Sequence, residues 1–278
     1  MLGAMSALTP EIEAYYERSD EAARLVAQPA GRLELLRTQD LLGRHLPAPP
    51  ARLLDVGGGA GIHALPLAAR GYEVHLVDPV ERHLGQARLA SGAAKRPLAS
   101  IETGDARRLD APDATYDGAL LLGPLYHLTD AADRLAALAE ARRVVKPGGV
   151  VVAAAISRFA STIDGLRLSF LRDGDFEAIV ETDVQTGQHR NPTARKGWFT
   201  TAYFHRPDEL GSELERAGLQ PIGVFAIEGP AWTLPDLAAW LDDPNDRARL
   251  MAAVARVEAE PSLLGASAHL LAVGRRIP

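Results

Sequence analysis

Residues 53–61 read Leu-Leu-Asp-Val-Gly-Gly-Gly-Ala-Gly, and this stretch decides the fold. An apolar run that ends in an acid predicts a buried strand, and the glycine-dense turn after it leads into a helical pattern over 61–70. Glycines let the backbone adopt positive φ and come close to a ligand. The start of a helix offers free N–H groups and the positive end of the helix dipole. The stretch therefore predicts a strand–turn–helix unit with a ligand at the turn.

Strand and helix patterns alternate along the chain on both sides of this unit. Pro147-Gly148-Gly149 predicts a turn before one of the strands, and Gly218 predicts the end of a helix. Such alternation is typical of the α/β class, in which a mostly parallel sheet is covered by helices on both faces. The predicted strands cover 52–56, 73–77, 98–102, 118–122, 150–156, 220–227 and 268–273, and the predicted helices cover 61–70, 82–90, 131–144 and 207–217.

Three segments lie outside this alternation. Residues 9–46 predict two helices, separated at Pro29-Ala30-Gly31. Residues 157–203 are polar, mixed in charge and rich in aromatic side chains, and they predict an insertion. A second insertion covers 228–265 and contains a helix around 247–259.

The composition excludes several classes of protein. The chain has 278 residues, and 30 Lys and Arg against 36 Asp and Glu give a net charge of −6, so we expect neither nucleic acid nor an anionic membrane as a partner. The absence of cysteine excludes disulfides, thiolate metal sites and cysteine nucleophiles, and the eight histidines lack H-x-x-x-H spacing, so no metal site is predicted. Residues 1–10 lack a secretory signal pattern and no apolar run reaches the ~20 residues of a membrane span, which predicts a cytoplasmic protein.

The residues around the glycine turn indicate the kind of ligand. Asp78 ends the next predicted strand, about 20 residues further on, where an acid accepts hydrogen bonds from ribose hydroxyls. Asp55 suits a cationic amino group, and Asp105 suits the amino group of an adenine. Residues 59–64 also fit the dinucleotide pattern G-x-G-x-x-A, so an NAD(P)-dependent oxidoreductase stays open at this point. No Tyr-x-x-x-Lys pair supports that alternative.

Taken in order, these motifs resemble those of the class I S-adenosylmethionine-dependent methyltransferases. The resemblance implies S-adenosylmethionine as the cofactor and a Rossmann-like seven-stranded sheet, parallel except for one antiparallel strand at 268–273. It also implies an N-terminal helical lid at 1–47 and a methyltransferase domain at 48–278, in which 158–204 form a cap and 228–265 a second insertion. The stretches that carry the resemblance are 55–61, Asp78, 104–106, 116–122, 145–149 and 204–210.

The same resemblance implies which residues contact the cofactor. Gly57 and Gly59 would face its methionine part, with Asp55 close to them. Asp78 would take the ribose hydroxyls, and the turn of Asp105 and Ala106 would face the adenine.

The resemblance also implies which residues lie below the cofactor and which residues cover it. Leu122 and Gly123 would lie beneath the methionine and the sulfonium, and Tyr16 and Arg37 would close over the cofactor from the N-terminal helices. His127 comes after the fourth predicted strand, where the acceptor should lie, so it is the first candidate for a catalytic base. Weaker candidates are Asp175, Glu177, His189 and His205.

The segment after the fourth predicted strand narrows the choice of methyl acceptor. Enzymes that methylate exocyclic amines of nucleic acid bases typically carry Asn/Asp-Pro-Pro-Tyr/Phe there, whereas residues 122–126 read Leu-Gly-Pro-Leu-Tyr. The paired-Glu loop typical of protein arginine methyltransferases is absent from the sequence. We therefore predict methyl transfer to oxygen or nitrogen of a small, aromatic or specialised metabolite by a monomer or homodimer.

Aromatic side chains gather in the first insertion, and their position supports two hypotheses about their role. Five of the six Phe lie between 159 and 204, where they would line an acceptor site or form the cap's own core. Carbon methylation of a quinone or prenyl-type acceptor and a non-catalytic adenosylmethionine-binding protein also stay open.

Overall fold

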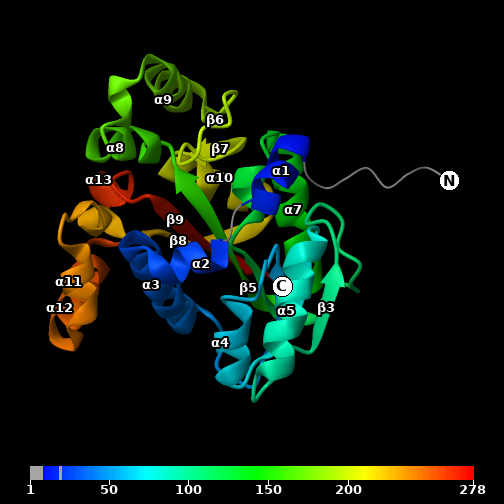
Figure 1. Ribbon diagram of the computed structural model, residues 1–278. Helices are drawn as coiled ribbons and strands as arrows, with labels where there is room; N and C mark the ends of the chain where they lie inside the picture. Colours follow the sequence, from blue (N-terminus) through cyan, green and yellow to red (C-terminus); the bar gives the residue numbers. More distant parts are fainter. Residues whose placement is uncertain (1–8, 19–20) are drawn as a thin grey trace.

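The computed structural model describes residues 9–18 and 21–278, and their main element is a sheet of nine strands (Figure 1). Hydrogen-bonded neighbours run in the order β3-β2-β1-β4-β5-β7-β6, while β9 pairs with both β5 and β8. The strands are β1 (Arg52–Val56), β2 (Glu73–Asp78), β3 (Ser100–Thr103), β4 (Tyr116–Leu121), β5 (Val145–Ser157), β6 (Gln188–His189), β7 (Ala202–His205), β8 (Leu219–Ala226) and β9 (His269–Arg276).

Helices surround the sheet and connect its strands. They are α1 (Pro10–Arg18), α2 (Glu21–Ala27), α3 (Pro29–His45), α4 (Ala64–Ala69), α5 (Glu81–Ala93), α6 (Pro124–His127), α7 (Ala131–Val144), α8 (Ala160–Arg167), α9 (Gly174–Thr186), α10 (Pro207–Arg216), α11 (Leu237–Asp242), α12 (Pro244–Val257) and α13 (Pro261–Leu264). Within the described ranges, no helix is long and apolar enough to cross a bilayer.

The strand directions confirm the predicted fold class. β1 runs parallel to β2 and β4, β4 runs parallel to β5, and β9 is antiparallel to both of its neighbours, as predicted for 268–273. The predicted count of seven strands is wrong, because the insertion after β5 adds two short strands. β7 pairs only with the last two residues of β5, and β6 has two residues, too few to produce a recognisable alternation in the sequence.

Alternate residues of the central strands point into two hydrophobic layers. Leu53 and Leu120 are fully buried with α3, α4 and α5 on one face of the sheet. Leu54 and Leu121 belong to the layer that α7 and α10 form on the other face. Burial on both faces explains why these strands read as continuous apolar runs in the sequence.

The N-terminal region differs from the prediction of two helices. Three helices occupy it, because the region before the predicted break holds both α1 and α2. The break itself lies at Gln28, since α2 ends at Ala27 and Pro29 begins α3. Proline is compatible with the first turn of a helix because its missing N–H would have no helical partner there. Residues 1–8 and 19–20, which belong to the predicted lid, and most of the segment tested for a secretory signal lie outside the described residues.

The turn predicted at Pro147-Gly148-Gly149 lies within β5. The pairing of β5 with β4 changes register between Tyr116 and Gly118, and Gly148 has a φ of +84°. The extra residues therefore form an irregularity inside a long strand.

The two insertions pack against different elements of the fold. Figure 1 shows α8, α9, β6 and β7 gathered at the top of the view, and α11 and α12 beside α3. Leu33 of α3 packs with Leu237, Leu241 and Val254 of the second insertion. Arg37 of α3 is fully buried and donates to the carbonyl of Ile227 and to the carboxylate of Glu258. The prediction that Arg37 closes over the cofactor is therefore wrong.

Candidate cofactor and acceptor site

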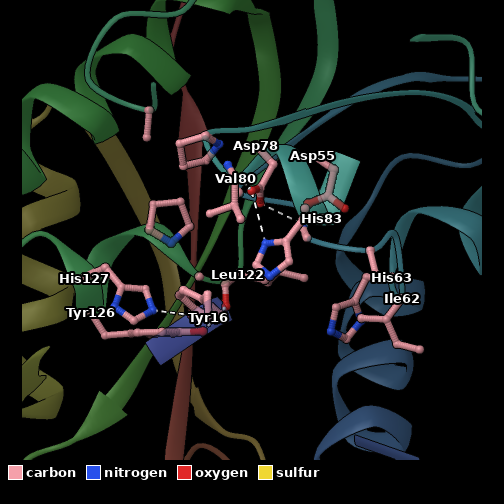
Figure 2. Close-up of a pocket in the computed structure, with 18 of the residues that line it drawn as sticks. Tyr16, Asp55, Ile62, His63, Asp78, Val80, His83, Leu122, Tyr126 and His127 are labelled. Atoms are coloured by element: carbon pink, nitrogen blue, oxygen red, sulfur yellow. Dashed lines mark hydrogen bonds and ion pairs between the residues drawn. The ribbon is translucent and has the colours of Figure 1, made fainter. Parts of the chain in front are cut away.

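A pocket opens at the carboxyl ends of β1, β2, β3 and β4 (Figure 2). β1 lies between β2 and β4, so the chain leaves this point of the sheet in opposite directions, which is where ligands bind in open α/β sheets. Ten of the predicted site residues line this pocket: Tyr16, Asp55, Gly57, Gly59, Asp78, Asp105, Ala106, Leu122, Gly123 and His127.

The glycine turn after β1 forms the floor of the pocket. Gly57, Gly59 and Gly61 have φ values of +68°, +56° and +82°, which other residues rarely adopt. A side chain at Gly57 would come within 2.8 Å of Pro124, whereas no atom lies within 4 Å of the position that a Cβ on Gly59 would take. The turn therefore leaves open space above Gly59 for a ligand.

Asp55 places a buried carboxylate below this turn. Its side chain is 1% exposed, and its Oδ2 atom has no hydrogen-bond partner. Burial, and then the negative charge of Asp78, raise the pKa of Asp55 to about 7. A cationic group in the pocket would satisfy this oxygen and stabilise its charged form.

Asp78 ends β2 with its carboxylate fixed by three donors. Its Oδ2 accepts from the backbone N–H of Gly59 at 2.9 Å, and its Oδ1 accepts from that of Val80 at 2.9 Å. His83 lies 3.2 Å from the same Oδ1 through its Nδ1. Each carboxylate oxygen can accept more than one hydrogen bond, so Asp78 retains capacity for ligand hydroxyls.

Asp105 lies on the turn after β3 and is held by Arg107. The guanidinium donates to Asp105 at 2.7 Å and to Asp133 at 2.9 Å. Burial alone would raise the pKa of Asp105, but the hydrogen bonds from Arg107 outweigh it and lower that pKa. A charged carboxylate therefore stands beside Ala106 at this end of the pocket.

The opposite end of the pocket joins α6 to α1. His127 is 9% exposed, and its Nε2 lies 2.5 Å from the hydroxyl of Tyr16, as the dashed line in Figure 2 shows. The Tyr16 ring also contacts His83 edge-on at 5.0 Å, and Arg82 donates to the Tyr16 carbonyl at 2.8 Å. Tyr16 thus bridges the α5 side and the α6 side of the pocket.

Most of the aromatic residues in the cap form its own core. Phe170, Phe176 and Trp198 pack with one another beneath α9. Phe204 packs in a second small cluster, and the Phe199 ring lies 6.0 Å from that of His127, which lines the pocket. The cap therefore acts on the pocket indirectly, through the contact of Phe199 with His127.

The weaker candidates for a base lie elsewhere. Asp175 and Glu177 are exposed in the first turn of α9. His189 is buried against Asp183, and His205 is buried against Glu213.

Comparisons with known proteins decide the family. A family described as "Methyltransferase domain" matches residues 53–149. The ubiquinone biosynthesis O-methyltransferase of Dinoroseobacter shibae is 30% identical over 206 residues, which cover 70% of this chain and 73% of that protein. The chain belongs to the class I S-adenosylmethionine-dependent methyltransferases.

Other similar proteins are also methyltransferases. The malonyl-[acyl-carrier protein] O-methyltransferase of Geobacter sulfurreducens is 33% identical over 193 residues, covering 69% of this chain and 64% of that one. A crystallised S-adenosylmethionine-dependent methyltransferase from Methanosarcina mazei shares the fold, with a TM-score of 0.56 and 16% identity over 85% of this chain and 97% of its own.

S-Adenosylmethionine is the cofactor of this methyltransferase, and the pocket fits it. The cofactor carries an ammonium group, and Asp55 offers a buried carboxylate oxygen that has no hydrogen-bond partner. The space above Gly59 is open, and Asp78 presents a fixed acceptor at the end of the second strand. These observations match the chemistry of the molecule from its amino group to its ribose.

The sequence analysis missed several residues of the pocket wall. His63 comes directly after the glycine turn, and burial lowers its pKa to about 4, so its imidazole is neutral. Arg24 and Glu34 reach the pocket from α2 and α3, and they form an ion pair at 2.9 Å. His63 could have been found from its position close to Gly61, whereas no local pattern marks Arg24 or Glu34.

Glu34 also belongs to a charged cluster that no motif predicted. Among the described residues, Glu34, Glu228 and His269 bring potential metal-ligand atoms within 4.8 Å of one another. Burial alone would lower the pKa of His269, but the charges of Glu34 and Glu228 outweigh it and raise that pKa to about 9. A metal ion would have to displace this proton. In the structure the cluster is held together by an ion pair, in which His269 donates to Glu228 at 2.6 Å.

Proposed function

We propose that this methyltransferase transfers the methyl group to an oxygen or nitrogen of a small metabolite, with an aromatic or specialised metabolite favoured. The observation that carries the proposal is the hydrogen bond between His127 and Tyr16 beside Leu122 and Gly123. A proton acceptor and aromatic surface thereby lie together at the end of β4. An acceptor that reacts through a hydroxyl or an N–H group loses a proton in the reaction, and a positioned histidine can take it.

The cofactor half of the pocket would hold the donor. When bound, S-adenosylmethionine supplies a methyl group on an activating sulfonium. Asp55 would pair with its ammonium, Asp78 would accept from its ribose hydroxyls, and Asp105 with Ala106 would contact its adenine. Gly57 and Gly59 would let its methionine chain lie against the backbone. Alignment of donor and acceptor and exclusion of water then supply the larger part of the catalysis.

The acceptor half would be closed by the N-terminal helices. Tyr16 contacts His127 on one side of the pocket and His83 on the other, and Arg82 holds its backbone. These contacts support the assignment of 1–47 as a lid over a methyltransferase domain at 48–278, with 158–204 as its cap and 228–265 as a second insertion.

Carbon methylation is the second candidate, and one comparison favours it. The demethylmenaquinone methyltransferase of Deinococcus radiodurans is 39% identical to this chain over 105 residues, which cover 42% of that protein. We favour oxygen or nitrogen because relatives named as O-methyltransferases align over about two thirds of this chain or more.

Calorimetric titration tests the cofactor part of the proposal. Purified protein is titrated in parallel with S-adenosylmethionine, S-adenosylhomocysteine and NADPH. We expect one site for each of the two sulfur ligands, with binding lost or strongly weakened in Asp55→Asn. The matched control is Asp113→Asn, an exposed carboxylate paired with Arg143 away from the pocket. Saturable binding of NADPH without either sulfur ligand would contradict the proposal.

A further inference from the structure

A buried histidine–carboxylate pair in the cap has no part in the proposed reaction. Asp183 of α9 and His189 of β6 are both buried, and Nδ1 of His189 lies 2.8 Å from Oδ2 of Asp183. Nε2 of His189 lies 2.7 Å from the carbonyl oxygen of Trp198. A carbonyl oxygen only accepts, so Nε2 of His189 donates to it. The pair therefore fixes the end of the loop that spans 190–200.

The next residue of that loop has an unusual backbone. Phe199 has a φ of +61°, a value that residues other than glycine adopt only where their surroundings enforce it. The side chain of Asn191 donates to the Phe199 carbonyl at 2.9 Å and to the Arg195 carbonyl at 2.9 Å. The Trp198 carbonyl therefore accepts from His189 and the Phe199 carbonyl accepts from Asn191, so a side chain fixes the peptide group on each side of the Phe199 α-carbon.

The ring of Phe199 lies at the centre of a cluster that reaches the candidate base. Its centroid is 6.0 Å from that of His127, and the two rings are inclined by 27°. It also contacts Tyr126 at 6.3 Å, Tyr15 at 5.4 Å and His189 at 6.3 Å. Backbone strain that is enforced in this way is found most often beside functional groups.

We propose that Asp183, His189 and Phe199 are positioning residues for His127. The buried pair fixes the loop, the loop holds Phe199 in its left-handed conformation, and the Phe199 ring keeps the His127 imidazole directed at the Tyr16 hydroxyl. This inference rests on the proposed function, in which His127 takes a proton from the acceptor. None of the three positioning residues needs to touch the acceptor itself.

The chain offers a matched control for a merely structural role. His205 and Glu213 form a second buried histidine–carboxylate pair, with Nε2 of His205 3.2 Å from Oε2 of Glu213. The His205 ring packs edge-on against Tyr203. A variant that breaks this pair therefore loses a buried histidine–carboxylate contact, as His189→Gln does, but keeps the contacts of Phe199.

The test is an NMR spectrum of the histidine side chains. Protein labelled with ¹⁵N-histidine is recorded with and without S-adenosylhomocysteine, and the His127 signals are assigned with His127→Asn. We expect His189→Gln and Phe199→Ala to shift the His127 imidazole signals and to remove the signal of the proton shared with Tyr16. Phe199→Tyr should restore the wild-type pattern, and His205→Gln should leave it unchanged.

Two results would overturn the inference. The first is wild-type His127 signals in both His189→Gln and Phe199→Ala. The second is an equal change in His205→Gln, which would mean that any loss of a buried pair disturbs His127. If His189→Gln does not fold, the Phe199 variants decide, because they leave the buried pair in place. Failure of S-adenosylhomocysteine to bind would contradict the proposed function. In that case the His127 signals of the ligand-free protein would still show whether His189 and Phe199 position His127.

Discussion

The cofactor half and the acceptor half of the pocket are built in different ways. The cofactor half comes from turns directly after β1, β2, β3 and β4, all within residues 53–149, the range that matches the family. The acceptor half joins Tyr16 of α1 to His127 of α6, and Phe199 of the cap packs against His127; the three residues are distant in sequence. The first half is fixed by the strands of the sheet, and the second depends on contacts between separate segments.

This difference indicates where specificity resides. A sheet edge with a glycine turn and three acids serves one ligand chemistry, since its geometry is set by the strand order. Aromatic contacts between a helix, a short turn and a cap can change one residue at a time while the sheet stays the same. We therefore expect changes in the two halves to have separable effects on donor binding and on methyl transfer.

The largest expected effect is on the acceptor half. His127→Asn should lower the rate of methyl transfer by about 10²- to 10⁴-fold, because it removes a general base. The dissociation constant of S-adenosylhomocysteine should change little. Steady-state kinetics with an identified acceptor and calorimetry on the same protein check both. A parallel loss of cofactor affinity would show that the two halves are not separable.

The next effect is on the cofactor half. Asp55→Asn should weaken S-adenosylmethionine binding by about 30- to 100-fold, since a charge-assisted hydrogen bond to a buried ammonium is worth about 2–3 kcal/mol. Calorimetry measures the change, with Asp113→Asn as the control. Unchanged affinity in Asp55→Asn would remove Asp55 from the cofactor site.

The pH dependence of cofactor binding should depend on the same group. Burial and the charge of Asp78 raise the pKa of Asp55 to about 7, so its neutral form favours folding of the free protein and that contribution is lost as the pH rises from 3.8 to 7. The ammonium needs the charged form, so affinity should fall by up to about tenfold per pH unit below 7. Above pH 7 it should level off until the ammonium of the ligand loses its own proton, at about pH 8. Titrations between about pH 5.5 and 8.5 check this, and Asp55→Asn should lose the dependence.

The smallest expected effect concerns stability and leaves both halves intact. His269 has a pKa raised to about 9 by the carboxylates of Glu34 and Glu228, which outweigh its burial. Its charged form therefore stabilises the fold fully below about pH 6.5, and this contribution is lost as the pH rises through 9. His269→Gln should lower the free energy of unfolding by about 1–2 kcal/mol at about pH 6 and by less at about pH 9.5. Denaturant titrations of both proteins at the two pH values measure this loss, and an equal loss of unfolding free energy at both would contradict the prediction.

The sequence named residues of both halves of the pocket, but for the second half it did not predict the contacts with the cap. Asp55, the glycine turn and Asp78 lie in a continuous strand–turn–helix pattern, whose position in the sheet is set by right-handed crossovers. Phe199 and the Asp183–His189 pair could not be predicted, because a left-handed backbone and a buried pair across α9 and β6 have no periodicity. Arg37 was misplaced because a helical pattern does not show that its partner is Glu258, more than two hundred residues away.

The most direct test of the proposed reaction is to trace the transferred methyl group. The protein is incubated with S-adenosylmethionine that carries a ¹³C-labelled methyl group and with phenol, amine and quinol acceptors, and the labelled product is examined by carbon NMR. We predict a label on oxygen or nitrogen of one acceptor class and its loss in His127→Asn. A label on carbon, or transfer that persists unchanged without His127, would contradict the account.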